Sequence, residues 1–176
     1  AELSTDDLRN DFESIDRRPL LMKWWSRLKP KVIPELLKPK PRPFYIGETI
    51  GREKQITQLR KNFRDRVNTI LVGDRGTGKR HLLSQVDGEG VYRIDSVSPA
   101  RESLVKICEQ LAKAGIIEMP KGRSATPFVE ALKEAGKTAK LTLVISSLDD
   151  ITRNEIKYLR AIAEHWTIFA SIESNQ

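Results

Sequence analysis

In the middle third of this chain an apolar run leads without interruption into a glycine-rich loop, an order that few folds accommodate. Residues 69–72 read Thr-Ile-Leu-Val, and residues 73–80 read Gly-Asp-Arg-Gly-Thr-Gly-Lys-Arg. The first run predicts a buried strand, and the apolar residues at helical spacing after the loop predict a helix. Because glycine has no Cβ atom, the loop can wrap closely around an anion and turn backbone N–H groups toward it. The helix dipole and Lys79 favour negative charge at the same place.

The spacing of the glycines and the lysine fits the phosphate-binding P-loop pattern G-x-x-x-x-G-K-[ST] at every position but the last. Arg80 stands where a small hydroxyl residue would hold a magnesium ion, and a guanidinium group cannot ligate a cation. The pattern therefore predicts phosphate binding and argues against metal-assisted hydrolysis; an ordinary glycine-rich strand-to-helix turn is the alternative. The residues predicted to form the phosphate cradle are Gly73, Asp74, Arg75, Gly76, Thr77, Gly78, Lys79 and Arg80.

The rest of the second half of the chain alternates strand-like runs with amphipathic helical patterns. Residues 141–145 are hydrophobic almost throughout, as expected for a strand buried on both faces. Such alternation predicts an α/β fold with a parallel sheet and helices on both of its faces. Strands are predicted at 69–72, 91–94, 141–145 and 167–172, and helices from 51, at 79–86, at 99–114, from 126 and around 156–163.

Two serines follow the strand at 141–145, in the order Ser146-Ser147-Leu148-Asp149-Asp150. In P-loop proteins the corresponding strand ends in a metal-holding Asp, which in ATPases is followed by a Glu that orients the attacking water. Neither serine can act as a general base at neutral pH. The natural strand register places Asp149 beyond the site, with the alternative that Asp149 reaches a cation through water if the strand runs on. Together with Arg80, this sequence predicts a domain that has given up hydrolysis.

Positive charge is concentrated in one third of the chain. The formal net charge is +7, yet residues 1–16 hold six acidic residues against Arg9 alone. Residues 17–45 hold nine Lys or Arg against Glu35 alone, and the surplus continues to residue 80. A block of this kind favours polyanions, so we expect DNA to bind through basic residues 17–80, with an anionic membrane surface as the other candidate.

Residues 1–43 are predicted to form a helical arm and linker in front of a domain at residues 44–176. An apolar stripe with two tryptophans at residues 20–28 predicts a helix that docks on the domain or on another subunit, lies at a membrane interface, or contacts nucleic acid. Prolines at positions 30, 34, 39, 41 and 43 exclude a helix or an inner strand, so an extended spacer is expected there.

Composition narrows the setting of the protein. The chain has 176 residues and no apolar run long enough to cross a membrane. With no recognisable signal peptide and the single cysteine Cys108, an intracellular, cytoplasmic location is expected. The two histidines, His81 and His165, are far apart and suggest no metal site.

Residues 44–176 resemble the nucleotide-binding domain of AAA+ ATPases, and in particular the archaeal replication-initiator (origin-recognition) and related signal-transducing NTPases. The resemblance rests on Gly51-Arg52-Glu53, the loop at 73–79, the segment 143–149 and the segment 168–175. The second motif of that family is an acid-acid-x-acid run, which residues 146–149 match with the first two acids replaced by serine.

The resemblance implies further roles for individual residues. Tyr45 and Ile46 would border the adenine, Lys79 would hold the β- and γ-phosphates, and Asn175 would be the sensor at the end of its strand. ATP or ADP is the implied ligand, whereas both usual sources of Mg²⁺ ligands are altered. Members of this family also carry a small helical lid after the sheet, which this sequence lacks, and we therefore expect a fragment of a longer protein.

Three functions follow as hypotheses from these observations. The first is a degenerate AAA+ module that holds ATP or ADP as a structural or switch ligand within an assembly on DNA, with hydrolysis weak or absent. The second is an AAA+-like scaffold that binds no nucleotide and is attached to a membrane or protein partner through its basic arm. The third is an active ATPase whose missing charge is supplied by partner subunits. Self-association or a protein partner is expected in each case.

Overall fold

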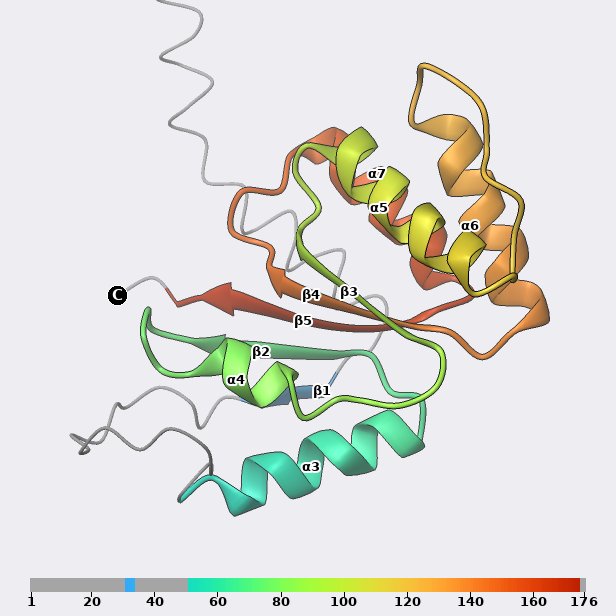
Figure 1. Cartoon of the computed structure of the whole chain (residues 1–176). Helices are drawn as coiled ribbons and strands as arrows, with labels where there is room; N and C mark the ends of the chain where they lie inside the picture. Colours follow the sequence, from blue (N-terminus) through green and yellow to red (C-terminus); the bar gives the residue numbers. More distant parts are fainter. Residues whose placement is uncertain (1–30, 34–50, 175–176) are drawn as a thin grey trace, which may run out of the picture.

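The computed structural model describes residues 31–33, for the backbone alone, and residues 51–174. Ten elements follow one another along these residues, with strands and helices alternating for most of the chain (Figure 1). Their bounds are β1 Lys31–Ile33, α3 Glu53–Arg64, β2 Thr69–Gly73, α4 Lys79–Leu83, β3 Val91–Ser96, α5 Ala100–Lys113, α6 Thr126–Thr138, β4 Thr142–Ser147, α7 Arg153–Ala163 and β5 Thr167–Glu173.

The five strands form one sheet in the order β1-β2-β5-β4-β3, and every neighbouring pair runs parallel. The predicted α/β fold with a parallel sheet is therefore confirmed. Because all strands point the same way, their carboxyl ends meet at one edge of the sheet. The loop after β2, the serines at the end of β4 and the end of β5 consequently lie near one another.

Helices cover both faces of the sheet, as the sequence predicts. Figure 1 shows α5, α6 and α7 on one face and α3 with α4 on the other. Alternate residues of β2, β4 and β5 point into two separate hydrophobic cores, as the two-residue period of a strand requires. In β5, for example, Ile168 and Ala170 join the core under α5–α7, whereas Phe169 joins the core under α3 and α4.

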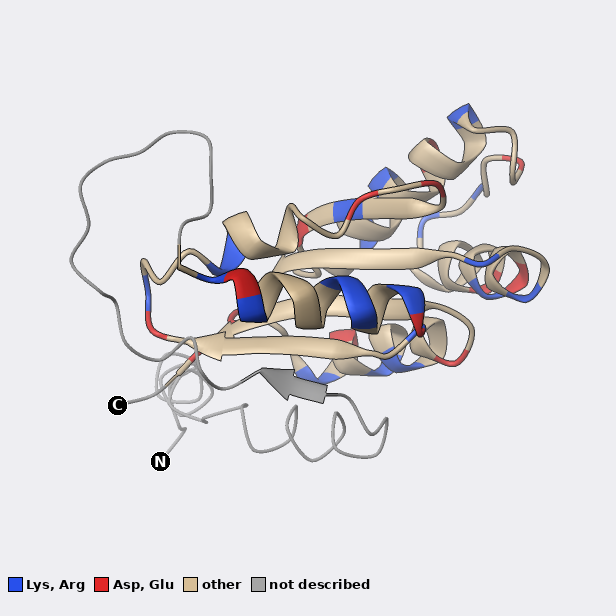
Figure 2. Ribbon diagram, turned by 90° about the horizontal axis from the view of Figure 1, so that it is seen from below, with Lys and Arg blue, Asp and Glu red and all other residues tan. Residues whose placement is uncertain are grey.

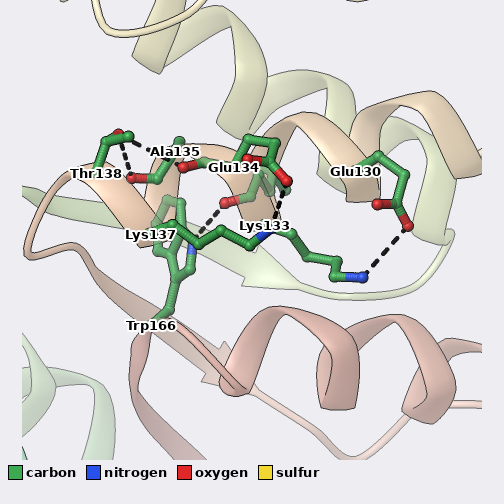
Figure 3. A network of polar contacts seen from close by, with 8 residues as sticks. Glu130, Lys133, Glu134, Ala135, Lys137, Thr138 and Trp166 are labelled. Atoms are coloured by element: carbon green, nitrogen blue, oxygen red, sulfur yellow. Dashed lines mark hydrogen bonds and ion pairs between the residues drawn. The ribbon is translucent and has the colours of Figure 1, made fainter.

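The larger core is closed by a tryptophan at the junction of α7 and β5. The indole Nε1 of Trp166 donates a hydrogen bond of 2.8 Å to the carbonyl oxygen of Leu132 in α6. Figure 3 shows this side chain beneath α6, below the surface ion pairs of that helix. A Cβ atom on Gly136 would lie 2.6 Å from the Trp166 ring, so only glycine lets the helix approach this closely.

Three bounds next to the site differ from the predicted ones. The helix after the glycine-rich loop ends at Leu83 rather than at residue 86, and a tighter turn of i→i−3 bonds continues to Val86. β4 and β5 each run beyond their predicted ends, to Ser147 and Glu173. These extensions carry polar residues to the edge of the sheet where the loop lies.

β1 lies within the stretch predicted to be an extended spacer. It pairs with β2 at the outer edge of the sheet, with Lys31 opposite Thr69 and Ile33 opposite Leu71. Prolines at positions 30 and 34 flank it, and an edge is where a sheet tolerates nearby proline. The other predictions for residues 1–50, including the helical arm and its tryptophans, lie outside the described residues.

Candidate functional site

The glycine-rich loop joins the end of β2 to the start of α4. Gly76 and Gly78 have φ angles of 79° and 80°, in the left-handed region that favours glycine. A Cβ atom at either position would meet no other atom within 4 Å. The need for glycine here is therefore conformational, because the backbone must turn sharply to bring the loop around to Lys79.

The loop is held in shape by hydrogen bonds to the backbone and side chain of Asp74. Thr77 is 3% exposed, and its Oγ1 donates to the carbonyl oxygen of Asp74 at 2.8 Å. The backbone N–H of Thr77 donates to the same oxygen at 3.3 Å. The hydroxyl of Ser174, just after β5, donates to Oδ1 of Asp74 and ties the loop to the neighbouring strand. The cradle is thus formed before any ligand arrives.

The ammonium group of Lys79 lies inside this loop. Lys79 is 8% exposed, and its Nζ donates to the carbonyl oxygens of Gly73 at 2.6 Å and Asp74 at 2.8 Å. Burial lowers the pKa of Lys79 below its ordinary value, while the nearby carboxylates of Glu173, Asp149 and Asp74 act in the opposite direction. A buried ammonium group therefore lies within the predicted phosphate cradle.

Backbone donors surround the same point. Within the part of the chain that the structure describes, no acceptor is paired with the backbone N–H groups of Gly76, Gly78, Lys79 and Arg80. Amide groups of this kind in a glycine-rich turn form an anion-binding concavity. The loop thus combines backbone donors with one buried ammonium group.

A pocket of about 650 Å³ opens beside the loop. Six of the eight residues predicted to form the phosphate cradle, residues 75–80, line it, whereas Gly73 and Asp74 lie behind it as the partners of Lys79. Apart from His81, the rest of the lining comes from the ends of β4 and β5, namely Ser146, Ser147, Asp149, Asp150, Ser171 and Glu173. The fold brings the predicted cradle and the predicted second motif to one cavity.

Asp149 lies in this pocket, although the sequence predicted a position beyond the site. β4 extends to Ser147, and Leu148 still pairs with β5 through a 2.9 Å bond from its N–H to the carbonyl oxygen of Ser171. Because Leu148 points into the core, the next residue faces the cavity. The strand runs further than hydrophobicity alone indicated, and the apolar Leu148 after the two serines was the signal for it.

The carboxylate of Asp149 is fixed by two donors. Its Oδ1 accepts from the backbone N–H of Glu173 at 2.7 Å, and its Oδ2 accepts from the hydroxyl of Ser147 at 2.6 Å. Glu173, which the sequence pattern did not single out, lines the pocket as well because β5 runs one residue further than predicted. Two carboxylates therefore line the same pocket as the glycine-rich loop.

The donors around the pocket do not form a recognisable metal centre. Among residues 51–174, no three side chains of His, Cys, Asp or Glu lie together in a way that could hold a metal ion. Arg80 is exposed beside the loop and offers only N–H donors. The hydroxyl of Ser147 is already engaged with Asp149.

Three predicted site residues, Tyr45, Ile46 and Asn175, lie outside the described residues. The same holds for the basic residues 17–30 and 34–50. The described portion of the basic block includes α3, which in Figure 2 carries a row of basic residues along its outer side. The exposed members of this row are Lys54, Arg60, Lys61 and Arg64.

Comparison with known proteins does not add a family. No model of a known protein family matches this chain, and none of the curated proteins is detectably similar to it. In the described part of the chain, no helix combines the length and apolar character that a membrane span requires.

Proposed function

We propose that this chain is a degenerate nucleotide-binding module of the AAA+ type, whose loop holds the phosphates of ATP or ADP as a structural or switch ligand. In this proposal hydrolysis is weak or absent, and the module works within an assembly on DNA. The observation that carries the proposal is the buried ammonium group of Lys79 inside a preformed glycine-rich loop that borders a cavity.

The chemistry of phosphate supports this ligand. In a P-loop the backbone N–H groups cradle phosphate oxygens and the lysine reaches the terminal phosphates. Here the same kinds of donor stand along one wall, with Arg75 and Arg80 exposed beside them. A phosphate would replace the carbonyl oxygens of Gly73 and Asp74 as the partner of Lys79, exchanging neutral acceptors for charged ones.

The loss of hydrolysis is argued from the donor set. Efficient phosphoryl transfer relies on a metal ion bridging the phosphates and on a residue that positions the attacking water. Ser146 and Ser147 stand where the resemblance expects acids, and Arg80 stands where it expects a hydroxyl. These residues do not fit a firmly held Mg²⁺, so no hydrolytic step is assigned to the site.

Calorimetric titration with ATP and with ADP, each with and without magnesium, tests nucleotide binding directly. Lys79→Ala should weaken binding at least about tenfold, because the substitution removes a charged donor from the phosphates. Lys106→Ala, an exposed lysine on α5 across the sheet, is the matched control and should bind as the unaltered chain does. If the unaltered protein releases no heat and shows no thermal shift with either nucleotide, the proposal fails.

Turnover should be measured on the same two variants. We expect the unaltered chain to release phosphate at a rate indistinguishable from that of Lys79→Ala, since neither protein would catalyse the reaction. A rate that falls on Lys79→Ala and not on Lys106→Ala would show an active ATPase instead.

One observation favours the second hypothesis, a scaffold without nucleotide. Lys79 is already satisfied by two carbonyl oxygens of its own loop, as it would be in a domain whose cradle has closed permanently. The titration above separates the two hypotheses, because only the scaffold is indifferent to nucleotide.

The proposed DNA partner is supported by the basic row on α3, whose four members are exposed on one side of the helix.

A retardation assay over a salt series gives the slope of log affinity against log salt. Each phosphate that a lysine neutralises contributes about 0.9 to this slope, so replacing Lys54 and Lys61 with alanine should make it shallower. Lys106→Ala with Lys113→Ala on α5 is the control pair. If the protein floats with anionic vesicles and does not bind DNA, the partner of the basic residues is a membrane surface and not DNA.

A further inference from the structure

The lining of the pocket carries charges of both signs. Arg75, Lys79 and Arg80 stand on the loop side, and three carboxylates stand at the strand ends, on Asp149, Asp150 and Glu173. Among the described residues, the fixed charges of the lining therefore nearly cancel. A ligand with more phosphates brings more negative charge into a pocket that holds no surplus of positive charge to meet it.

The carboxylates lie close to the group that would meet the terminal phosphate. Glu173 and Asp149 line the same pocket as Lys79, and their negative charges act to raise the pKa of the Lys79 ammonium against the larger lowering by burial. The lysine of a P-loop reaches the β- and γ-phosphates, so the outermost phosphate of a bound nucleotide lies next to these carboxylates. The negative charges of the phosphate and of the carboxylates repel each other, and this repulsion is stronger where bulk water is excluded.

Asp149 cannot easily swing away. Its two oxygens accept from the N–H of Glu173 at 2.7 Å and from the hydroxyl of Ser147 at 2.6 Å. Among the described residues, no hydrogen bond holds the Glu173 carboxylate in the same way, so that Asp149 is the more rigid of the two charges. A rigid charge discriminates between ligands because it cannot relax out of the way.

Building on the nucleotide site proposed above, we infer that this pocket selects ADP over ATP and that Asp149 is the specificity-determining residue. The third phosphate of ATP places additional negative charge against the wall formed by Asp149 and Glu173. Among the residues described, no group of three or more acidic, histidine or cysteine side chains stands in this pocket to hold the magnesium ion that would otherwise offset that charge.

Calorimetric titration in the presence of EDTA tests the inference, with the ratio of the two dissociation constants as the readout. We expect the unaltered chain to bind ADP about tenfold more tightly than ATP. Asp149→Asn should bring the ratio to within about threefold of unity, chiefly by tightening ATP. The amide retains an oxygen for the Glu173 N–H and an N–H group for the Ser147 hydroxyl, so the loop should keep its shape.

Two further variants guard against a trivial result. Glu173→Gln should lower the ratio less than Asp149→Asn does, and it keeps the backbone N–H that anchors Asp149. Asp95→Asn, an exposed residue of β3 outside the pocket lining, should leave the ratio unchanged. Thermal unfolding of each variant confirms that it is folded.

The outcomes separate this inference from the proposed function. If neither nucleotide binds, the nucleotide site itself fails and the inference falls with it. If both nucleotides bind but ATP is as tight as ADP, or Asp149→Asn leaves the ratio unchanged, only the inference is overturned. It is also overturned if magnesium makes ATP the tighter ligand, because Asp149 would then act as a metal ligand.

Discussion

The α5–α6–α7 face of the sheet and the edge at the glycine-rich loop are built on different principles. The face has long helices whose buried apolar residues enter one continuous core. The edge carries a five-residue helix, two left-handed glycines and a cavity lined by charges of both signs. From this comparison we expect the free energy of unfolding to depend mainly on the face, and the proposed ligand binding to depend on the edge.

The largest loss of stability should come from the face, by Trp166→Ala. Trp166 is 3% exposed, donates to Leu132 and meets Tyr92 edge-on with ring centroids 5.9 Å apart. We expect the free energy of unfolding to fall by about 3–5 kcal/mol, because the substitution removes buried apolar surface and leaves a cavity. Urea unfolding followed by circular dichroism measures it. Arg75→Ala at the edge should change it by less than about 0.5 kcal/mol, and equal losses would erase the contrast.

A smaller loss of stability is expected from Glu155, at the start of α7. The buried carboxylate of Glu155 accepts from the N–H of Ala100 at 3.0 Å and from the N–H of Thr152 at 2.7 Å. It thereby caps α7 and joins it to the first turn of α5. Glu155→Ala should cost about 1–3 kcal/mol, because both donors are left without an acceptor. The exposed Glu164→Ala, at the end of the same helix, should be nearly silent in the same urea titration; similar losses would refute the capping role.

At the edge, a substitution in the loop should reduce stability only modestly but should remove nucleotide binding. Gly78→Ala places a side chain at a φ of 80°, which costs about 1–2 kcal/mol although the space around it is open. The same change should abolish the nucleotide heat measured by calorimetry, because the loop can no longer hold its turn. A variant that lost stability and kept full affinity would show that the loop does not form the binding site.

The prediction with the smallest effect on stability concerns the buried thiol of Cys108 and its reactivity toward thiol reagents. Burial raises the pKa of its thiol to about 12, so at about pH 8 it should resist thiol reagents until the protein unfolds. The unfolded chain releases this proton near pH 8.5 and the folded chain retains it, so the contribution of this group to stability falls as pH rises from about 8.5 to 12. Rapid labelling of the folded chain at the same pH would show that the face opens locally.

The sequence predicted the architecture better than it predicted the pocket. Periodicity located β2 to β5 and the helices, because buried apolar residues at spacings of two or of three to four leave a clear pattern. Asp149 and Glu173 were missed because they are polar residues at strand ends, where hydrophobicity fades before the hydrogen bonding does. The position of the Lys79 ammonium depends on carbonyl oxygens of the backbone, which no side-chain pattern reveals.

The place of β5 has a consequence for how this domain comes into being. It is the last of the described strands in the chain, yet it lies in the interior of the sheet, between β2 and β4. β2 and β4 have no hydrogen-bonded ladder with each other. The pair β1–β2 and the pair β3–β4 are therefore joined only through β5. During synthesis the pairs β1–β2 and β3–β4 can each form, but the sheet cannot be completed until residues 167–173 have left the ribosome, because only β5 joins the two pairs.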